Sequence, residues 1–255
     1  MATLHRYNGS AWVQVPNGTT VSHYNGSAWV NPTHVKYWDG DSWETAWSKS
    51  DPITLAFTCN ASQGWRSTAA WRTDTKVRFG AFSTFGDNLT VLEFSADSTT
   101  GGYTSTSLAE ALAVRPNVTA LKLTLTRGSG GASTISGSTS ETLLVGQLNK
   151  TNGTSMSTYN AGSFVQTTNM QTIPASDLQG WSYLSSQTKQ FTFGGSASTL
   201  TGLATHLSTK QMWISEKSSG WIASGGGTST SDIYSVCNGS ADSSGKPILT
   251  VTMDY

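Results

Sequence analysis

The chain has 255 residues, of which only 12% are charged, and its 15 basic and 15 acidic residues give a formal net charge of zero. This balance speaks against a nucleic acid or an anionic membrane as partner, because both attract basic surfaces. The length suits one large domain, or a small module followed by one domain. A chain so poor in charge must cover its surface with Ser, Thr, Asn and Gly, which suits a protein packed into a larger assembly.

The beginning of the chain carries no targeting signal. Residues 1–20 lack a basic start followed by an apolar core, and no run of about 18 apolar residues occurs. We therefore expect no signal peptide and no insertion into a membrane. A protein of this kind would be made in the host cytoplasm and would leave by lysis or as part of a particle.

Cys59 and Cys237 are the only cysteines and lie far apart in the sequence. This arrangement implies no disulfide framework and favours free buried thiols. A late disulfide in an oxidising medium remains the alternative.

The first 47 residues repeat one phrase three times, at 5–13, 22–30 and 36–44. Each copy reads aromatic, Asn or Asp, Gly, Ser or Asp, small residue, Trp. Asn-Gly and Asp-Gly adopt the positive φ values of tight turns at little cost, so each copy predicts the tip of a β-hairpin. The two aromatic residues of a copy should then lie opposite or diagonal to each other on the two arms. These repeat aromatics are Tyr7, Trp12, Tyr24, Trp29, Trp38 and Trp43.

A single two-stranded hairpin is marginally stable in water. The three hairpins should therefore lean on each other, on the rest of the chain, or on identical chains. Their aromatic residues have two interpretations. They form the small core of a repeat module, or some of them stay exposed as stacking platforms for sugar rings.

The sequence Ser-Lys-Ser-Asp-Pro at 48–52 breaks the repeat rhythm and predicts a boundary. We divide the chain into residues 1–50, a β-hairpin repeat module, and residues 51–255, whose short alternating segments are typical of a β-sandwich. Strands are expected at 53–57, 75–80, 89–94, 120–127, 143–146, 164–165, 170–173, 190–193, 211–215 and 247–255, a turn at 63–66, and Ser- and Gly-rich loops at 128–140 and 217–246.

Two short helices interrupt the strands. Ser107 and Glu110 have the spacing of a capping box, and Pro116 prevents a long continuation, so a helix is expected over 107–112. Leucines at 200, 203 and 207 predict a second helix over 200–207. The predicted fold class is therefore all-β, a hairpin repeat module followed by a sandwich with one or two short helices.

The repeat phrases, Tyr-Asn-Gly-Ser-Ala-Trp-Val and Trp-Asp-Gly-Asp-Ser-Trp, resemble units that recur in minor tail and tail-fibre proteins of bacteriophages. Choline-binding repeats also use aromatic hairpins, but their Gly-Trp-aromatic-aromatic order is absent here. The resemblance implies a structural protein of the virion tail with other tail proteins as partners. By likeness to tail fibres it also implies a homo-trimer.

The strand order of residues 53–255, together with the closing phrase Pro-x-Leu-Thr-Val-Thr, resembles the jelly-roll domain of the DNRLRE and related carbohydrate-binding families. It is also similar to receptor-binding domains at the ends of phage tail fibres. The acidic and Arg signature of the DNRLRE family is not present in that form. The resemblance implies a jelly-roll sandwich that binds a host cell-surface glycan.

The chain shows no local motif for catalysis or for a metal. None of the four histidines, His5, His23, His34 and His206, has a second His or a Cys at metal-ligand spacing. Hydrolysis of a glycan needs two carboxylates about 5–10 Å apart. The relevant glutamates of the second part are Glu93, Glu110, Glu141 and Glu216, of which Glu110 is better explained as a helix cap.

We therefore predict no catalytic residue, no metal and no cofactor. Asp87, Asp97 and Asp242 are candidate Ca²⁺ ligands, but no spaced acidic loop demands the ion. Because carboxylates need only meet in space, a polysaccharide hydrolase with an N-terminal binding repeat remains an alternative. A decoration protein of the virion that binds no ligand is a third possibility.

Three tryptophans follow a glycine in polar surroundings: Trp65, Trp181 and Trp221. Exposed aromatic residues beside Asn, Gln and Ser are what a glycan site needs, so these three are the predicted ligand contacts. The other interpretation is that each packs under its own loop as a small satellite core.

Overall fold

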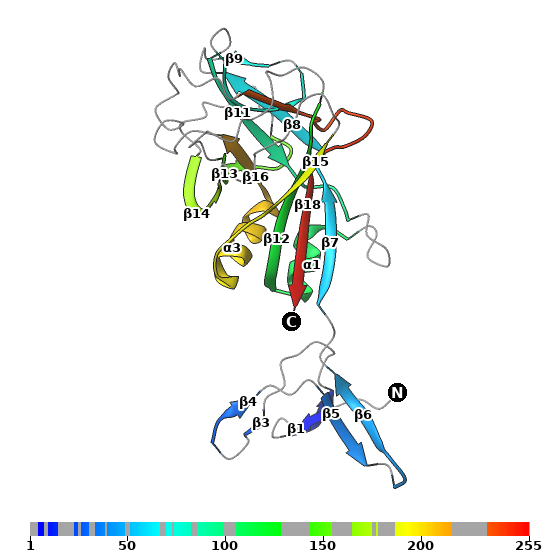
Figure 1. The fold of residues 1–255 in the computed structure, drawn as a ribbon. Coiled ribbons are helices and arrows are strands. Elements are labelled where there is room, and N and C mark those ends of the chain that lie inside the picture. Colours follow the sequence, from blue (N-terminus) through cyan, green and yellow to red (C-terminus); the bar gives the residue numbers. More distant parts are fainter. Residues whose placement is uncertain are drawn as a thin grey trace.

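The computed structural model describes residues 5–7, 10–14, 23–24, 27–30, 34–38, 40–48, 52–66, 70–72, 74–82, 86–98, 106–128, 143–154, 165–174, 177, 187–215 and 234–254. Within these residues the regular structure consists of antiparallel strands and two helices, which confirms the all-β prediction (Figure 1). No helix among them is long and apolar enough to cross a membrane.

Each of the three sequence repeats forms its own two-stranded antiparallel sheet. The pairs are β1 (His5–Tyr7) with β2 (Trp12–Gln14), β3 (His23–Tyr24) with β4 (Trp29–Val30), and β5 (His34–Trp38) with β6 (Trp43–Ser48). The register sets Tyr7 opposite Trp12, Tyr24 opposite Trp29, and Trp38 opposite Trp43. The predicted cross-strand placement is therefore confirmed, and it is the same in all three hairpins. In the third turn Gly40 has a φ of 115°, which explains the glycine of the phrase.

A four-stranded sheet forms one layer of the sandwich. Its order is β15 (Thr188–Thr192), β12 (Asn117–Thr126), β18 (Ile248–Asp254) and β7 (Ile53–Thr58). Leu121, Leu123 and Leu125 of β12 are fully buried, whereas the residues between them are only half-buried. The alternation predicted for this segment is confirmed and turns one face of the sheet toward the core.

The second layer is a sheet of eight strands. Its main order is β14 (Val165–Ile173), β13 (Leu143–Thr151), β16 (Lys210–Ser215), β11 (Gly86–Glu93), β10 (Val77–Phe82) and β17 (Tyr234–Cys237); in addition β8 (Ala61–Arg66) pairs with β11, and β9 (Ala70–Trp71) pairs with β8. Strand β11 therefore contacts three strands, and its residues contribute to both faces of the sheet.

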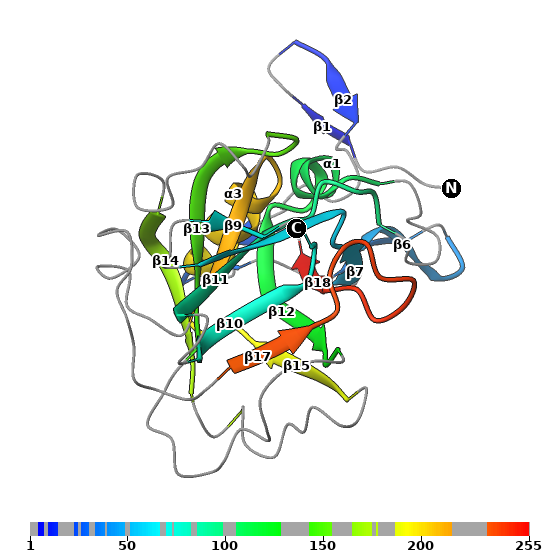
Figure 2. The same ribbon diagram turned by 90° about the horizontal axis from the view of Figure 1, so that it is seen from above.

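The main core lies between the inner faces of the two sheets and includes both helices. Helix α3 (Ala197–Leu207) contacts β12 of the small sheet and β16 of the large one, and Leu200, Leu203 and Leu207 are buried against them. Figure 2 shows α3 beside α1 (Leu108–Val114). Both predicted helices are confirmed, although α3 begins three residues earlier than expected because Ser196 is its N-cap.

Three local predictions were wrong. A loop was expected at 217–246, but Tyr234–Cys237 form strand β17, which pairs with β10. The turn expected at 63–66 is part of strand β8, and Gly64 serves close packing there. A Cβ at Gly64 would lie 3.3 Å from Cδ of Arg72, whose stem passes over the strand. The two short strands expected at 164–165 and 170–173 are one strand, β14, with a register shift near Asn169, which has a φ of 56°. Such a bulge breaks the sequence alternation without ending the strand.

Both cysteines are free and buried, which confirms the prediction. Cys59 directly follows β7, and Cys237 ends β17 and pairs with Val77. Burial raises the pKa of each thiol to about 12. Neither thiol is therefore ionised at neutral pH, and both behave as small core residues.

Candidate functional site

Of the three predicted glycan contacts, the structure describes only Trp65. Its side chain is 6% exposed and belongs to a second apolar cluster, on the outer face of the large sheet. This placement supports the satellite-core interpretation for Trp65, because a stacked sugar ring needs an exposed aromatic face. Trp181 and Trp221 lie outside the described residues.

The second cluster is built by the alternation of the large sheet. Leu89 and Val91 of β11 and Trp213 of β16 point outward, whereas Leu92 and Met212 point into the main core. The large sheet is therefore buried on both faces, which the sequence alone did not predict. The sequence feature that could have indicated this second buried face is the continuous apolar run at 212–214.

Among the repeat aromatics, the structure describes the side chain of Trp43, which is 63% exposed. The strands of the other repeat aromatics are described, but their side chains lie outside the described residues. An indole exposed at a hairpin tip can stack on a sugar ring or pack against another protein surface.

Glu93 is a buried carboxylate, 4% exposed, at the end of β11. Four donors surround it: Asn60 Nδ2 at 2.8 Å, Ser95 Oγ at 2.6 Å, the backbone N–H of Gly153 at 2.7 Å, and Gln211 Nε2 at 2.9 Å. Burial alone would raise the pKa of Glu93, but these hydrogen bonds outweigh it and hold the pKa below its usual range. Because the chain itself supplies all four donors, Glu93 links its own segment to those of Asn60, Gly153 and Gln211.

The other candidate carboxylates also have structural partners or lie outside the described residues. Glu110 Oε2 accepts the backbone N–H of Ser107 at 2.9 Å and its hydroxyl at 2.8 Å, so the predicted capping box is confirmed. These hydrogen bonds lower the pKa of Glu110. Glu141 and Glu216 are not among the described residues.

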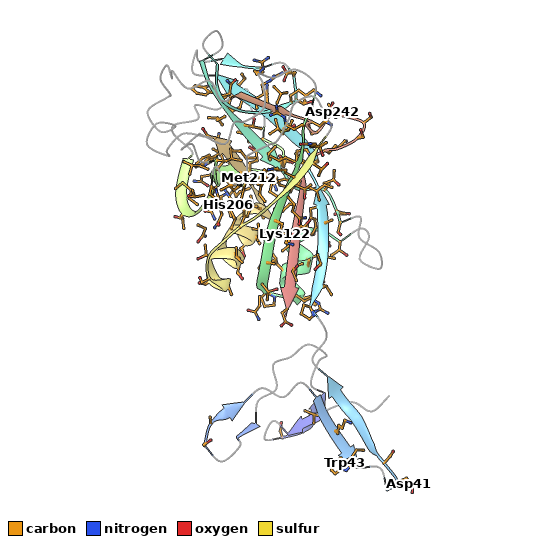
Figure 3. All side chains as sticks on the ribbon, viewed as in Figure 1. Asp41, Trp43, Lys122, His206, Met212 and Asp242 are labelled. Atoms are coloured by element: carbon orange, nitrogen blue, oxygen red, sulfur yellow. The ribbon has the colours of Figure 1, made fainter. Side chains whose placement is uncertain are left out.

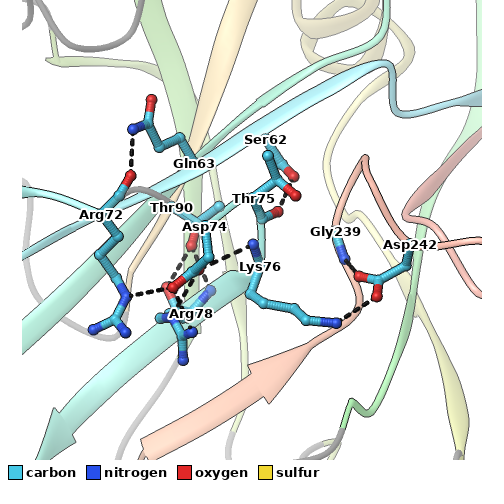
Figure 4. A network of polar contacts seen from close by, with 10 residues as sticks. All are labelled: Ser62, Gln63, Arg72, Asp74, Thr75, Lys76, Arg78, Thr90, Gly239 and Asp242. Carbon is cyan, nitrogen blue, oxygen red and sulfur yellow. Dashed lines mark hydrogen bonds and ion pairs between the residues drawn. The ribbon is translucent and has the colours of Figure 1, made fainter.

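An ion-pair network ties the end of the large sheet together (Figure 4). Asp74 accepts hydrogen bonds from Arg72 Nε at 3.2 Å and from Arg78 Nη2 at 2.9 Å, and Lys76 pairs with Asp242. Burial would raise the pKa of Asp74, but the two guanidinium groups lower it.

The second half of that network holds the chain just before β18. Burial would raise the pKa of Asp242, but the Lys76 ammonium and the Gly239 backbone N–H lower it. Asp242 is therefore engaged by the protein itself. Asp97 is exposed, and the side chain of Asp87 is not described. In the described part of the chain, no group of three His, Cys, Asp or Glu side chains is placed to hold a metal.

The four histidines give no sign of a metal site where their surroundings are described. His206 Nε2 lies 3.0 Å from the carbonyl oxygens of both Leu148 and Gln211, so this nitrogen carries the proton and donates it. Burial lowers the pKa of His206 and favours the neutral ring. His5, His23 and His34 lie in the hairpin strands, and their side chains are not described.

A hollow of about 410 Å³ opens between strand β7 and helix α1. Among the described strands β7 is the last one of the small sheet, so the hollow lies at an edge of that sheet. Its apolar lining is Ile53, Leu55, Ala111 and Val114, and its polar lining is Thr106, Glu110 and Arg115. Val114 is 61% exposed at the last turn of the helix.

This composition resembles that of pockets that hold small ligands. Apolar floors with a few polar groups are typical of pockets for small ligands, and 410 Å³ falls within their usual range. Glu110 places a carboxylate at the hollow, and its Oε2 is already engaged by Ser107. Among the described residues that line it, one carries a carboxylate, whereas glycoside hydrolysis needs two. The sequence identified Glu110 as a cap but did not place it beside β7, since that contact joins segments more than fifty residues apart.

No protein-family model matches the chain, and the search of curated proteins finds no match.

Proposed function

We propose that the chain is a non-catalytic structural and binding protein of a bacteriophage tail, of the minor tail or tail-fibre type. The hairpins at 1–50 form the repeat module that attaches the chain to other tail proteins or to identical chains, as a homo-trimer. The sandwich at 51–255, which we interpret as a jelly roll, binds a host cell-surface saccharide in the hollow between β7 and α1.

The observation that carries the proposal is the identical aromatic register of three hairpins. Their strands are only two to six residues long, and each pair forms a separate sheet. Such hairpins need further contacts to be stable. Three equivalent aromatic pairs, with Trp43 exposed, provide a repeated surface for those contacts. The resemblance of the repeat phrase to phage tail proteins agrees with this role.

The attachment role is tested in the full-length chain by replacing Trp12, Trp29 and Trp43 together with alanine. We expect the sandwich to stay folded and the chain to lose its assembled mass in light scattering and its incorporation into particles. The matched control replaces Ser10, Ser27 and Ser42, which are exposed at the same hairpin tips, with alanine. Normal incorporation of the tryptophan variant would refute the attachment role.

The saccharide role is tested by Val114→Glu, which places a second negative charge beside Glu110 in the hollow. We expect binding of purified host cell-wall saccharides to weaken at least tenfold. Thr205→Glu, on the exposed face of α3, is the control. Unchanged binding would refute the hollow as the site, and release of shortened saccharides by the wild-type chain would favour the hydrolase instead.

A further inference from the structure

The outer face of the four-stranded sheet is dominated by threonine. Burial alternates along β7, β12 and β18, and along β15 Phe191 points inward between exposed neighbours. The side chains on this side of the sheet, called here the threonine face, are Thr54, Ala56, Thr58, Ala120, Lys122, Thr124, Thr126, Thr188, Gln190, Thr192, Ile248, Thr250, Thr252 and Asp254, of which Thr126 is buried. Figure 3 shows Lys122 on this face, on β12.

Threonine is the polar residue best suited to strands, which explains why it is frequent here. The registers also bring threonines together. Thr54 lies opposite Thr252 and Thr126 opposite Thr188, and the hydroxyl oxygens of each pair are 2.9 Å apart. The free-energy cost of removing water from a hydroxyl group is smaller when that group keeps a hydrogen bond to another hydroxyl. Covering this face therefore carries a small desolvation cost.

The two charged side chains of the face are Lys122 and Asp254. Lys122 lies opposite Thr250, and Asp254 follows four residues later on β18, about 13 Å along the strand. Consider a two-fold axis in the contact plane that crosses the line between these two residues at its midpoint and at a right angle. Such an axis would set each Lys122 opposite the Asp254 of another copy. The face is therefore complementary in charge to itself, as an isologous contact requires.

We propose that the threonine face is a contact surface for a second copy of this chain, with Lys122 of each copy paired to Asp254 of the other. A saccharide fits it less well, because sugar sites are concave and use aromatic rings, and none of the fourteen side chains is aromatic.

The size of the face sets the strength of the contact. Four strands spaced about 4.8 Å apart and about 20 Å long cover about 400 Å² in projection, or about 800 Å² for two copies. Specific interfaces usually bury more than about 1,000 Å² in total. The contact is therefore weak on its own and acts between two trimers, where several equivalent contacts form together and strengthen one another.

This inference rests on the proposed homo-trimer: a trimer has no two-fold axis, so the threonine face joins copies that belong to two different trimers. The test is the mass of the full-length chain by light scattering over a range of concentrations. Thr250→Arg, at the centre of the face, should reduce the assembled mass, whereas Thr205→Arg on α3 should leave it unchanged. Thermal unfolding shows whether both variants are folded. A folded Thr250→Arg chain that assembles like wild type would overturn the inference.

Charge reversal provides a second test that does not place a bulky side chain in a central strand. Lys122→Glu alone and Asp254→Lys alone should each weaken association roughly tenfold, because like charges then face each other at two symmetric positions. The double variant should recover wild-type association, and failure to recover would overturn the pairing. If saccharide binding persists while the mass is unaffected by every variant, the contact is refuted and the saccharide role stands. If the mass changes as expected but no saccharide binds, the contact stands and the saccharide role is refuted.

Discussion

Replacing Gly146 with alanine should strongly destabilise the sandwich. Gly146 lies directly opposite Trp213 in the pairing of β13 with β16. A Cβ at this position would come within 2.5 Å of Cε2 and Cζ2 of the indole and 2.7 Å of Nε1. Trp213 is fully buried, so its ring cannot swing into solvent to make room. Overpacking costs about 1–3 kcal/mol, and a rigid ring with no free side places this substitution near the upper end, about 3 kcal/mol.

Urea unfolding followed by circular dichroism measures this effect. With a slope of about 2–3 kcal/mol per molar urea, the midpoint should fall by about 1 M. Gly194→Ala is the matched control, because a Cβ at Gly194 meets no atom within 4 Å. Trp213→Phe removes the atoms that the new methyl group would contact. The two substitutions together should therefore cost less than the sum of the single costs, by at least about 1 kcal/mol. A Gly146→Ala protein within about 0.5 kcal/mol of wild type would refute this reasoning.

Three further predictions follow from the polar network, the helix cap and the thiols. Glu93→Gln turns an amide N–H₂ toward existing donors and should lower the free energy of unfolding by about 2–4 kcal/mol at pH 7. Because folding lowers the pKa of Glu93, the stability advantage of the wild type is complete above the ordinary value of 4.5 and should vanish as pH falls through the lower folded pKa. Urea unfolding from pH 7 to pH 3 measures this dependence. Ser107→Ala should lower stability by about 1 kcal/mol in the same assay, and Glu110→Gln by less, since glutamine can also complete a capping box. Cys59 and Cys237 should react with a thiol reagent at pH 8 only after denaturant is added, and rapid labelling of the folded chain would contradict their burial.

Where the structure confirms a prediction, the information was local. The turns of the repeats place the aromatic residues opposite each other because an Asn-Gly or Asp-Gly tip aligns the two arms. The first helix was predictable because Ser107 and Glu110 are three residues apart and complete its cap by themselves. The leucines of 120–127 alternate because one face of their strand is buried.

Predictions failed where the surroundings of a residue are set by another strand or loop and not by its immediate neighbours in the sequence. Gly64 suggested a turn, but the glycine makes room for the stem of Arg72. Trp65 suggested an exposed platform, but β11 and β16 bring Leu89 and Trp213 to the same face of the sheet. In both cases the residues that pack at that position come from another segment and not from its neighbours along the chain.

The sequence by itself determined the all-β class, the three hairpins with their aromatic register, the capped helix and the free thiols, because each depends on residues close in the chain or on composition. Only the tertiary structure decided that Glu93 is held by four donors, that β7 and α1 enclose a hollow, and that the threonines of four strands form one face. Strand pairing brings together segments up to about two hundred residues apart. Periodicity reveals which side of a strand is buried, but it carries no record of which strand lies next to it.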